Sequence, residues 1–427
     1  MHRDNRGMHP GALLDLASSL LQAVLRLDQP GDRVVSAFFK AHRTLGPRER
    51  HTLAETAYAV LRRRLQFQHL AQSGTGPLER RLAQLAWQGD PEYLRRGMTP
   101  QEITWLGQVQ GIDPGTLADK LRHNLPDWVA TPLGEELGPD GFWALVGALD
   151  VAAPLDLRVN ILKARREDAM AGLALEGMVA EPTPYSPWGL RMQGKPALNR
   201  LPAFLQGEVE VQDEGSQLLA LLTGAGRGEM VVDFCAGAGG KTLALGAMMR
   251  NTGRLYAFDT SDHRLAALKP RLARSGLSNV HPVRIAHERD DRIRRLEGKI
   301  DRVLVDAPCS GLGTLRRNPD LKWRQSPASV KELCDLQARI LASAARLLRP
   351  GGRLVYGTCS LLRSENEDIA QAFSDAHAGL FDPVPVADVL AEARVTAAQS
   401  LVSGPFFRTW PHLHQTDGFF TAVWQKR

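Results

Sequence analysis

Five short apolar segments alternate with helical patterns in the second half of the chain. The segments read EMVVDFC, GRLYAFD, HPVRIA, IDRVLVDAP and GRLVYGTC, and helical patterns follow most of them, notably at 262–274 and 326–348. Continuous apolar strands that alternate with helices are typical of a parallel sheet with helices on both faces. The pattern therefore predicts a doubly wound α/β domain over residues 216–427.

Helical periodicity dominates the first third of the chain. One apolar stripe recurs at helical spacing and consists of Leu13, Leu16, Leu20 and Val24. Further along, strand-like stretches such as APLDLRVNILKA and turns rich in Pro and Gly replace the helical pattern. We therefore predict a helical domain at 1–145, a small α/β (RRM-like) module at 146–215, and the α/β domain at 216–427.

The composition suits a globular protein with a nucleic-acid partner. The net charge is +6, and arginine, which pairs with phosphate and stacks on bases, is commoner than lysine. No apolar run approaches the roughly 20 residues of a membrane span, and the first residues lack the apolar core of a signal peptide. The four cysteines form no CxxC pair. We expect a cytoplasmic monomer with no membrane segment, no disulfide framework and no metal.

The string DFCAGAGGKTLAL, residues 233–245, combines a strand end, a glycine turn and a helix start. A Walker A loop needs a glycine five positions before the glycine of Gly-Lys-Thr, and Cys235 occupies that position. The dinucleotide pattern also fails, because Thr242 stands where its third glycine belongs. What remains is a turn that lets the backbone approach a ligand that has no phosphates. If that ligand contains a ribose, Asp259 is placed to accept both of its hydroxyls. S-adenosylmethionine fits this description.

Two cysteines follow strands that end at the same predicted sheet edge. DAPCSG places Asp306 and Cys309 after the fourth strand, and GTCS places Cys359 after the fifth. Cys334 instead lies at the edge of the apolar stripe of 326–348 and is assigned to packing.

The chemistry that suits these residues is methylation of a pyrimidine at carbon 5. A thiolate adds to carbon 6, and carbon 5 then takes a methyl group from a sulfonium donor. An acid at ring nitrogen 3 stabilises the developing charge, and a base removes the carbon 5 proton. Cys359, Asp306 and Cys309 would fill this list of one nucleophile, one acid and one proton acceptor.

At these motifs the sequence resembles the RNA cytosine-5 methyltransferases with two active-site cysteines. The resemblance covers about 150–427 and rests on LRVN, VQDEGSQL, the glycine loop, DAPCSGLGTLRRNPDLKW, GTCSLLRSENED and TDGFFTAVW, in this order. Within the family the chain is most similar to the bacterial ribosomal RNA small-subunit methyltransferase B group, whose N-terminal helical domain resembles the antitermination factor NusB. The resemblance implies a Rossmann-like class I methyltransferase sheet preceded by an all-α domain and a small α/β module, S-adenosylmethionine as cofactor, and RNA as partner.

The resemblance also implies roles for individual residues. Cys359 would be the nucleophile, Cys309 would assist release of the methylated base, and Asp306 would meet the cytosine, with Lys241 close by. The methionine part of the cofactor would lie along Cys235, Ala236, Gly237, Ala238, Gly239, Gly240 and Lys241. Asp259 would bind the ribose, and Asp306 would also border the cofactor. RNA contacts are expected from Arg158, Asn160, Arg316, Arg317 and Lys322.

The sequence departs from the family in two places. Ala238 stands where the family usually has a proline. After the third strand the family usually has an aspartate near the adenine, whereas this chain reads IAHERDD. His287 is the matching position by its distance from Asp306, with Glu288 and Asp290 close behind.

Three alternatives remain at this stage. DNA cytosine-5 methyltransferases share the thiolate chemistry, but they carry a Pro-Cys nucleophile and a Glu-Asn-Val string, and SENED here follows the wrong strand. A non-catalytic RNA-binding assembly factor could retain a decayed methyltransferase fold, although both cysteines and the cofactor loop argue against decay. Small-subunit ribosomal RNA is the expected target, and transfer RNA is the alternative.

Overall fold

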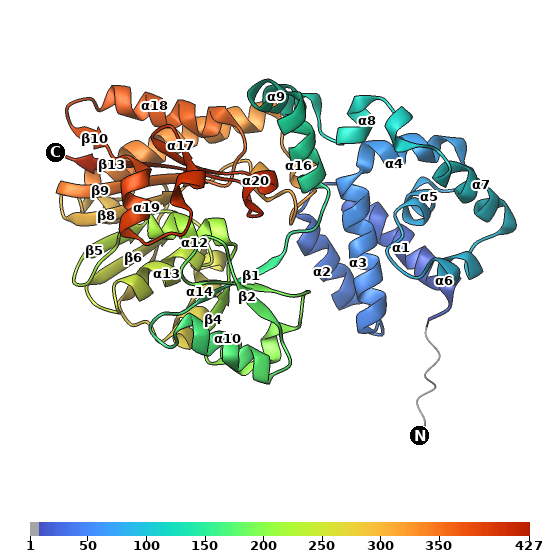
Figure 1. Ribbon diagram of the computed structural model, residues 1–427, viewed down its shortest axis with the longest axis horizontal. Coiled ribbons are helices and arrows are strands. Elements are labelled where there is room, and N and C mark those ends of the chain that lie inside the picture. Colours follow the sequence, from blue (N-terminus) through green and yellow to red (C-terminus); the bar gives the residue numbers. More distant parts are fainter. Residues whose placement is uncertain (1–7) are drawn as a thin grey trace. The chain divides into compact units, whose positions relative to one another are not determined.

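The computed structural model describes residues 8–427 and divides into two compact units (Figure 1). The helical unit comprises the chain up to Val151 together with 315–326, and the sheet unit comprises 152–314 and 327–427. The chain therefore passes between the units three times, because the segment 315–326 leaves the sheet unit and rejoins the helical unit.

Helices form most of the helical unit, in agreement with the helical periodicity of its sequence. They are α1 (Pro10–Val24), α2 (Gly31–Ala41), α3 (Pro47–Arg62), α4 (Arg64–Leu70), α5 (Leu78–Leu85), α6 (Pro91–Arg96), α7 (Pro100–Gln110), α8 (Asp119–His123), α9 (Asp127–Leu149) and the short α16 (Leu321–Arg324). The predicted stripe on α1 is buried at Leu13, Leu20 and Val24. In the described part of the chain, no helix is long and apolar enough to cross a membrane.

A small antiparallel sheet opens the sheet unit. Its elements are β1 (Leu155–Val159), α10 (Arg166–Leu175), β2 (Ala180–Pro182), β3 (Gly189–Met192), α11 (Pro202–Leu205) and β4 (Val209–Val211), and the strand order is β2-β3-β1-β4. Two crossovers with this strand order are typical of a ferredoxin-like βαββαβ fold. Leu157, Leu173 and Leu190 lie in its core.

A nine-stranded sheet forms the rest of the sheet unit. Its strands are β5 (Met230–Asp233), β6 (Arg254–Asp259), β7 (Val280–Arg284), β8 (Ile300–Asp306), β9 (Leu348–Thr358), β10 (Phe381–Pro383), β11 (Val402–Ser403), β12 (Phe406–Thr409) and β13 (Phe419–Lys426). The strand order is β11-β12-β13-β9-β8-β5-β6-β7, with β10 paired to β13. β5 to β9 pair in parallel, whereas β13 runs antiparallel to β9.

Helices cover both faces of this sheet, as the continuous apolar strands predict (Figure 1). The covering helices include α12 (Glu214–Leu221), α13 (Gly240–Met248), α14 (Asp262–Ser275), α15 (Asp291–Arg294), α17 (Pro327–Leu347), α18 (Glu367–Ala376) and α19 (Val386–Glu392). Successive strand residues enter opposite cores, since Val303 and Val305 lie in one apolar cluster and Leu304 lies in the other. The observed architecture is the predicted Rossmann-like α/β fold.

The strand order reverses between β5 and β8. From β5 the chain builds outward through β6 and β7, then crosses back to place β8 and β9 on the other side of β5. Ligands of doubly wound sheets bind at the carboxyl ends of the strands at such a switch point. Asp233, Asp259 and Asp306 end three of these strands.

Candidate active site

The two predicted active-site cysteines lie side by side. Cys359 directly follows β9, Cys309 follows β8 by three residues, and their Sγ atoms are 3.5 Å apart. The two loops are also joined through the backbone, because Gly313 N–H donates to the Cys359 carbonyl at 2.8 Å. Both cysteines are half-buried. The structure thus brings together two thiols that are 50 residues apart in the sequence.

The environment of Cys309 favours its protonated form. The hydrogen bond with Cys359 and burial, in that order, raise the pKa of the Cys309 thiol well above its usual value, and the charges of Cys359 and Glu365 act in the same direction. Cys309 therefore holds its proton strongly while Cys359 is free of substrate.

Lys241 and Asp306 form an ion pair at the same sheet edge. Lys241 Nζ lies 2.7 Å from Asp306 Oδ2, on side chains that are 11% and 28% exposed. Burial alone would lower the pKa of Lys241, but the charge and hydrogen bond of Asp306, with smaller contributions from Cys359 and Asp233, raise it above its usual value. Lys241 is therefore a fixed cation that holds the Asp306 carboxylate in place.

The predicted cofactor loop, Cys235 to Lys241, joins β5 to α13. Ala236 N–H donates to the Phe258 carbonyl, and Gly239 N–H donates to the Ala236 carbonyl, both at 2.8 Å. Gly239 has a φ of +85°, and a Cβ at this position would lie 2.1 Å from Leu268 Cδ1. Only glycine meets both conditions, so the turn depends on it.

Asp259 supports the glycine loop from the end of β6. One carboxylate oxygen accepts Gly237 N–H at 2.9 Å, and the other accepts Ser261 N–H at 2.7 Å. The side chain is 5% exposed and faces the loop predicted to hold the cofactor. The predicted ribose ligand and the predicted methionine loop are thus in direct contact.

Asp233, which ends β5, is a site residue that was not singled out from the sequence. Thr242 Oγ1 donates to its Oδ2 at 2.7 Å, while its buried Oδ1 has no hydrogen-bond partner within residues 8–427. Burial raises the pKa of Asp233 to about 7, with the charges of Asp306 and Asp259 adding to the effect. The strand-terminal position of Asp233 was the available signal.

The residues after β7 have different surroundings from one another. Asp290 caps α15 and also accepts Ala286 N–H, which lowers the pKa of its carboxyl. Glu288 is paired with Arg339 of α17 at 3.2 Å. His287 is exposed, and its Nδ1 accepts Arg289 N–H at 3.1 Å. Of the three residues, His287 alone has a side chain without a structural ion pair or capping role among the described contacts.

Arg158 and Asn160, predicted to contact RNA, are buried in the sheet unit. Arg158 Nε donates to Gln212 Oε1 at 2.6 Å, and burial lowers the pKa of its guanidinium to about 10. The Asn160 amide donates to the carbonyls of Gly207 and Ser275, both at 3.0 Å. Their placement gives the prediction of RNA contact no support, because both side chains hold the protein together.

The predicted RNA contacts at 316–322 belong to the helical unit. Lys322 Nζ donates to the Arg62 carbonyl at 2.8 Å, and burial lowers the pKa of this lysine to about 7. Arg316 is buried, and Arg317 is half-buried. The following residue, Trp323, packs on the core of the helical unit and donates to the Leu61 carbonyl at 2.7 Å. Lys322 thus contributes to packing and is not presented to an RNA in this structure.

Glu365 is a second residue that was not singled out from the sequence. It is fully buried, and its Oε1 accepts Ser310 N–H at 2.8 Å and the Gln337 amide at 3.1 Å. Its Oε2 accepts the hydroxyls of Ser310 and Ser360, each at 2.5 Å. Tyr356 O–H donates to the Glu365 carbonyl at 2.6 Å. The repeated Cys-Ser step at 309–310 and 359–360 was the signal in the sequence.

The residues around the glycine loop fit S-adenosylmethionine. The space beside Gly237 is open, since a Cβ there would have no neighbour within 4 Å, although its φ of +56° favours glycine. The unpartnered Asp233 Oδ1 and the Asp259 carboxylate offer acceptors to a cofactor with an ammonium group and ribose hydroxyls. In residues 8–427, no three His, Cys, Asp or Glu side chains gather as a metal site.

Comparisons with known proteins show the family to which similar sequences belong. Residues 220–425 match the family described as "16S rRNA methyltransferase RsmB/F", and 125–199 match a ferredoxin-like domain described for the same proteins. The chain is 34% identical over 306 residues to the "Probable ribosomal RNA small subunit methyltransferase B" of Synechocystis, which covers 71% of this chain and 67% of that protein.

Two solved structures extend the similarity to the fold. PH0851 has a TM-score of 0.78 at 25% identity and covers 99% of this chain and 100% of its own. A methyltransferase homolog protein from Pyrococcus horikoshii has a TM-score of 0.61 at 28% identity and covers 74% of this chain and 100% of its own.

Proposed function

The chain belongs to the RsmB/F family of 16S ribosomal RNA methyltransferases, and we propose that it methylates carbon 5 of a cytosine in RNA through a covalent adduct with Cys359. S-adenosylmethionine is the methyl donor of this enzyme. The observation that carries the proposal is the 3.5 Å separation of the Cys309 and Cys359 sulfurs beside the Lys241–Asp306 pair. One thiol serves the attack and the other serves the release.

Attack begins at Cys359. Its thiolate forms a bond to carbon 6, and electron density moves toward ring nitrogen 3. Asp306 in its protonated form donates a proton to that nitrogen and takes it back when the product is released, and Lys241 keeps the carboxyl oriented. Carbon 5 has then become nucleophilic, and the cofactor supplies the methyl group that it accepts. Cys235 to Lys241, Asp259 and His287 are the residues proposed to hold that cofactor.

Release depends on Cys309. The hydrogen bond and the charge of Cys359 both raise the pKa of Cys309, and both disappear once the Cys359 sulfur is bonded to carbon 6. Cys309 then gives its proton to solvent more readily, and the resulting thiolate accepts the proton from carbon 5. The carbon–sulfur bond breaks, its electron pair returns to Cys359, and the double bond between carbons 5 and 6 is restored. Within one turnover Cys359 thus acts as nucleophile and leaving group, and Cys309 acts as the base.

The test compares single-cysteine variants on an RNA substrate. Cys309→Ala is expected to accumulate a protein–RNA adduct that survives denaturation, whereas Cys359→Ala is expected to form none. Bisulfite sequencing of RNA from cells that lack the protein, complemented with wild type or Cys359→Ala, identifies the methylated cytosine. An adduct with Cys359→Ala alone would reverse the two assignments.

The proposed substrate is small-subunit ribosomal RNA. The family description and the related Synechocystis protein support this target. A cytosine protected from bisulfite in transfer RNA, and not in ribosomal RNA, would favour the alternative substrate. No protected cytosine together with no binding of S-adenosylmethionine would favour a non-catalytic assembly factor.

A further inference from the structure

We infer that Glu365 is a positioning residue that keeps Cys309 beside Cys359 during turnover, an inference that rests on the proposed cytosine-5 chemistry. Each serine bound by this carboxylate directly follows one of the two cysteines. One buried side chain therefore links both cysteine loops. A carboxylate with four hydrogen-bond donors around it has little freedom to move.

The two loops do not depend on Glu365 equally. The Cys359 loop continues from β9, whose last residue, Thr358, pairs with β13, and the Ser360 carbonyl accepts the Asn366 amide at 3.0 Å. These contacts remain when Glu365 is changed. The Cys359 loop thus has anchors of its own.

The Cys309 loop relies more strongly on the carboxylate. Glu365 holds Ser310 through both its N–H and its hydroxyl. The Pro308 carbonyl accepts the Gln337 amide at 2.9 Å, and this amide is itself hydrogen-bonded to Glu365. Loss of the carboxylate therefore loosens the side of the site that carries Cys309.

Loosening Cys309 affects one half of the reaction. Cys359 can still attack carbon 6, but the base that removes the carbon 5 proton is displaced. Misplacing a catalytic group by about 1 Å costs on the order of 100-fold in rate. The covalent adduct should therefore form at nearly the normal rate and decay slowly.

The test uses single-turnover methylation of a labelled RNA fragment, with samples denatured in detergent to separate adduct from product. The variants are Ser310→Ala, which removes one hydroxyl, and Glu365→Gln, which keeps the shape and removes the charge. The matched control is Ser275→Ala, since Ser275 is a buried serine of the same unit whose hydroxyl makes two hydrogen bonds, neither of them to a residue of the two cysteine loops. We expect the adduct lifetime to rise by about 10-fold to 100-fold in the two variants, and to match wild type in the control.

Several outcomes distinguish this role from others. Equal slowing of adduct formation and decay, or a fall in folded protein without a longer adduct lifetime, would overturn the positioning role and leave a structural one. Normal adduct decay in both variants, while Cys309→Ala accumulates adduct, would overturn it as well. Absence of any adduct with Cys309→Ala would refute the proposed function itself.

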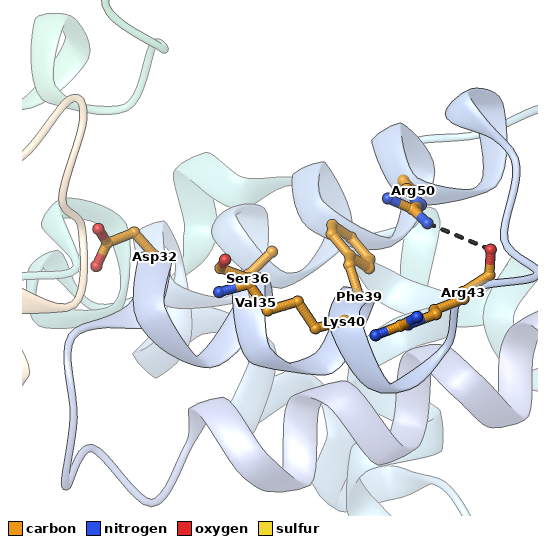
Figure 2. Close-up of a pocket in the computed structure, with 7 residues that line it drawn as sticks. All are labelled: Asp32, Val35, Ser36, Phe39, Lys40, Arg43 and Arg50. Atoms are coloured by element: carbon orange, nitrogen blue, oxygen red, sulfur yellow. Dashed lines mark hydrogen bonds between the residues drawn. The ribbon is translucent and has the colours of Figure 1, made fainter. Parts of the chain in front are cut away.

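A separate observation concerns a hollow on the helical unit. The cavity has a volume of about 540 Å³ and lies against α2 and the start of α3. Figure 2 shows Asp32 at one end of it and Phe39, Arg43 and Arg50 toward the other. Lys40 and Arg43 are exposed, and Phe39 is half-buried.

The charges of this hollow are unbalanced. Its lining contains three cations, Lys40, Arg43 and Arg50, and one carboxylate, Asp32. In the described part of the chain, none of the three cations forms an ion pair of 4 Å or less. Arg50 is fixed by the Leu45 carbonyl at 2.9 Å and lies 5.7 Å from the centre of the Phe39 ring. Exposed cations beside an aromatic ring suit a strand with phosphates and unstacked bases.

The geometry points to a single-stranded RNA segment at this hollow, with phosphates on Lys40 and Arg43 and a base on Phe39. This inference rests on the RNA partner of the proposed function. It gives the helical unit a defined contact that the buried Lys322 does not supply. Its affinity should fall with salt, because phosphate contacts release counterions.

The test measures the anisotropy of a fluorescein-labelled single-stranded RNA over a series of salt concentrations. Replacing Lys40 and Arg43 by Ala together should weaken binding and reduce the slope of log K against log salt by about 1.4, from about 0.7 for each phosphate contact. The control replaces Arg95 and Arg122, which are exposed but ion-paired, by Ala. An unchanged slope in the double variant, or an equal fall in the control, would overturn the assignment.

Discussion

Changing Asp233 to Asn should abolish the part of the pH dependence of the unfolding free energy that comes from titration of this buried carboxyl. The folded protein holds the Asp233 carboxyl with a pKa of about 7, against 3.8 for the ordinary group. At pH values between 3.8 and about 7, the folded protein keeps a proton on Asp233 that the unfolded chain has released. The free energy of unfolding therefore falls as pH rises through this window and is level above it.

The size of the effect follows from the shift. A rise from 3.8 to about 7 corresponds to roughly 4 kcal/mol between the two protonation states, of which about 2 to 3 kcal/mol falls between pH 5 and pH 8. Asparagine keeps the shape and can still accept the Thr242 hydroxyl, but it carries no titrating proton. The wild type should therefore lose about 2 to 3 kcal/mol more than Asp233→Asn over this range.

Urea unfolding at pH 5 and pH 8, followed by tryptophan fluorescence, measures the difference. Other titrating groups cancel when the variant is compared with wild type at each pH. Asp291→Asn is the control, since Asp291 is exposed and should follow wild type. Parallel pH profiles for wild type and Asp233→Asn would refute the reasoning, because the buried carboxyl would then not be protonated in the folded state.

Three further substitutions test other features of the structure. Gly239→Ala forces a φ of +85° on a residue whose Cβ meets Leu268, and we expect a loss of about 2 kcal/mol in unfolding free energy and weaker S-adenosylmethionine binding by calorimetry. Arg158→Met removes the partner of Gln212 and should lower the free energy of unfolding by about 1 to 3 kcal/mol in thermal unfolding. The RNA affinity of the folded protein should stay the same, and a selective loss of RNA binding would restore the predicted contact role of Arg158. Cys334→Ser should methylate RNA as wild type does, and an inactive variant would contradict its assignment to packing.

The sequence predicted that the two cysteine loops share one edge of the sheet, and the reason is physical. Parallel strands end at one edge, so a residue just past β8 and another just past β9 must lie near each other if the strands are neighbours. Cys309 and Cys359 satisfy this condition, and Lys241 in the first turn of α13 reaches Asp306 at the end of β8, the neighbour of β5. Strand ends and a glycine turn can be recognised in a single sequence, because each is a local pattern.

The predictions that failed to gain support involve contacts between distant segments. Arg158 and Lys322 carry charges that are typical of RNA-binding residues, but their burial depends on partners 54 and 260 residues away. Glu365 follows Cys359 closely, yet its role depends on Ser310, 55 residues upstream. No local pattern encodes such pairings, because only the folded chain brings these groups together.

The segment 315–326 limits how these proteins can be divided and recombined. It leaves the sheet unit just after the Cys309 loop, packs the half-buried Trp323 against the core of the helical unit, and returns at Pro327. A gene fragment that begins at residue 152 would encode this segment without the apolar surface that receives it. A fragment of this chain that starts at residue 152 should therefore leave Trp323 without its packing partners, and we expect it to be less stable than the same residues in the full chain.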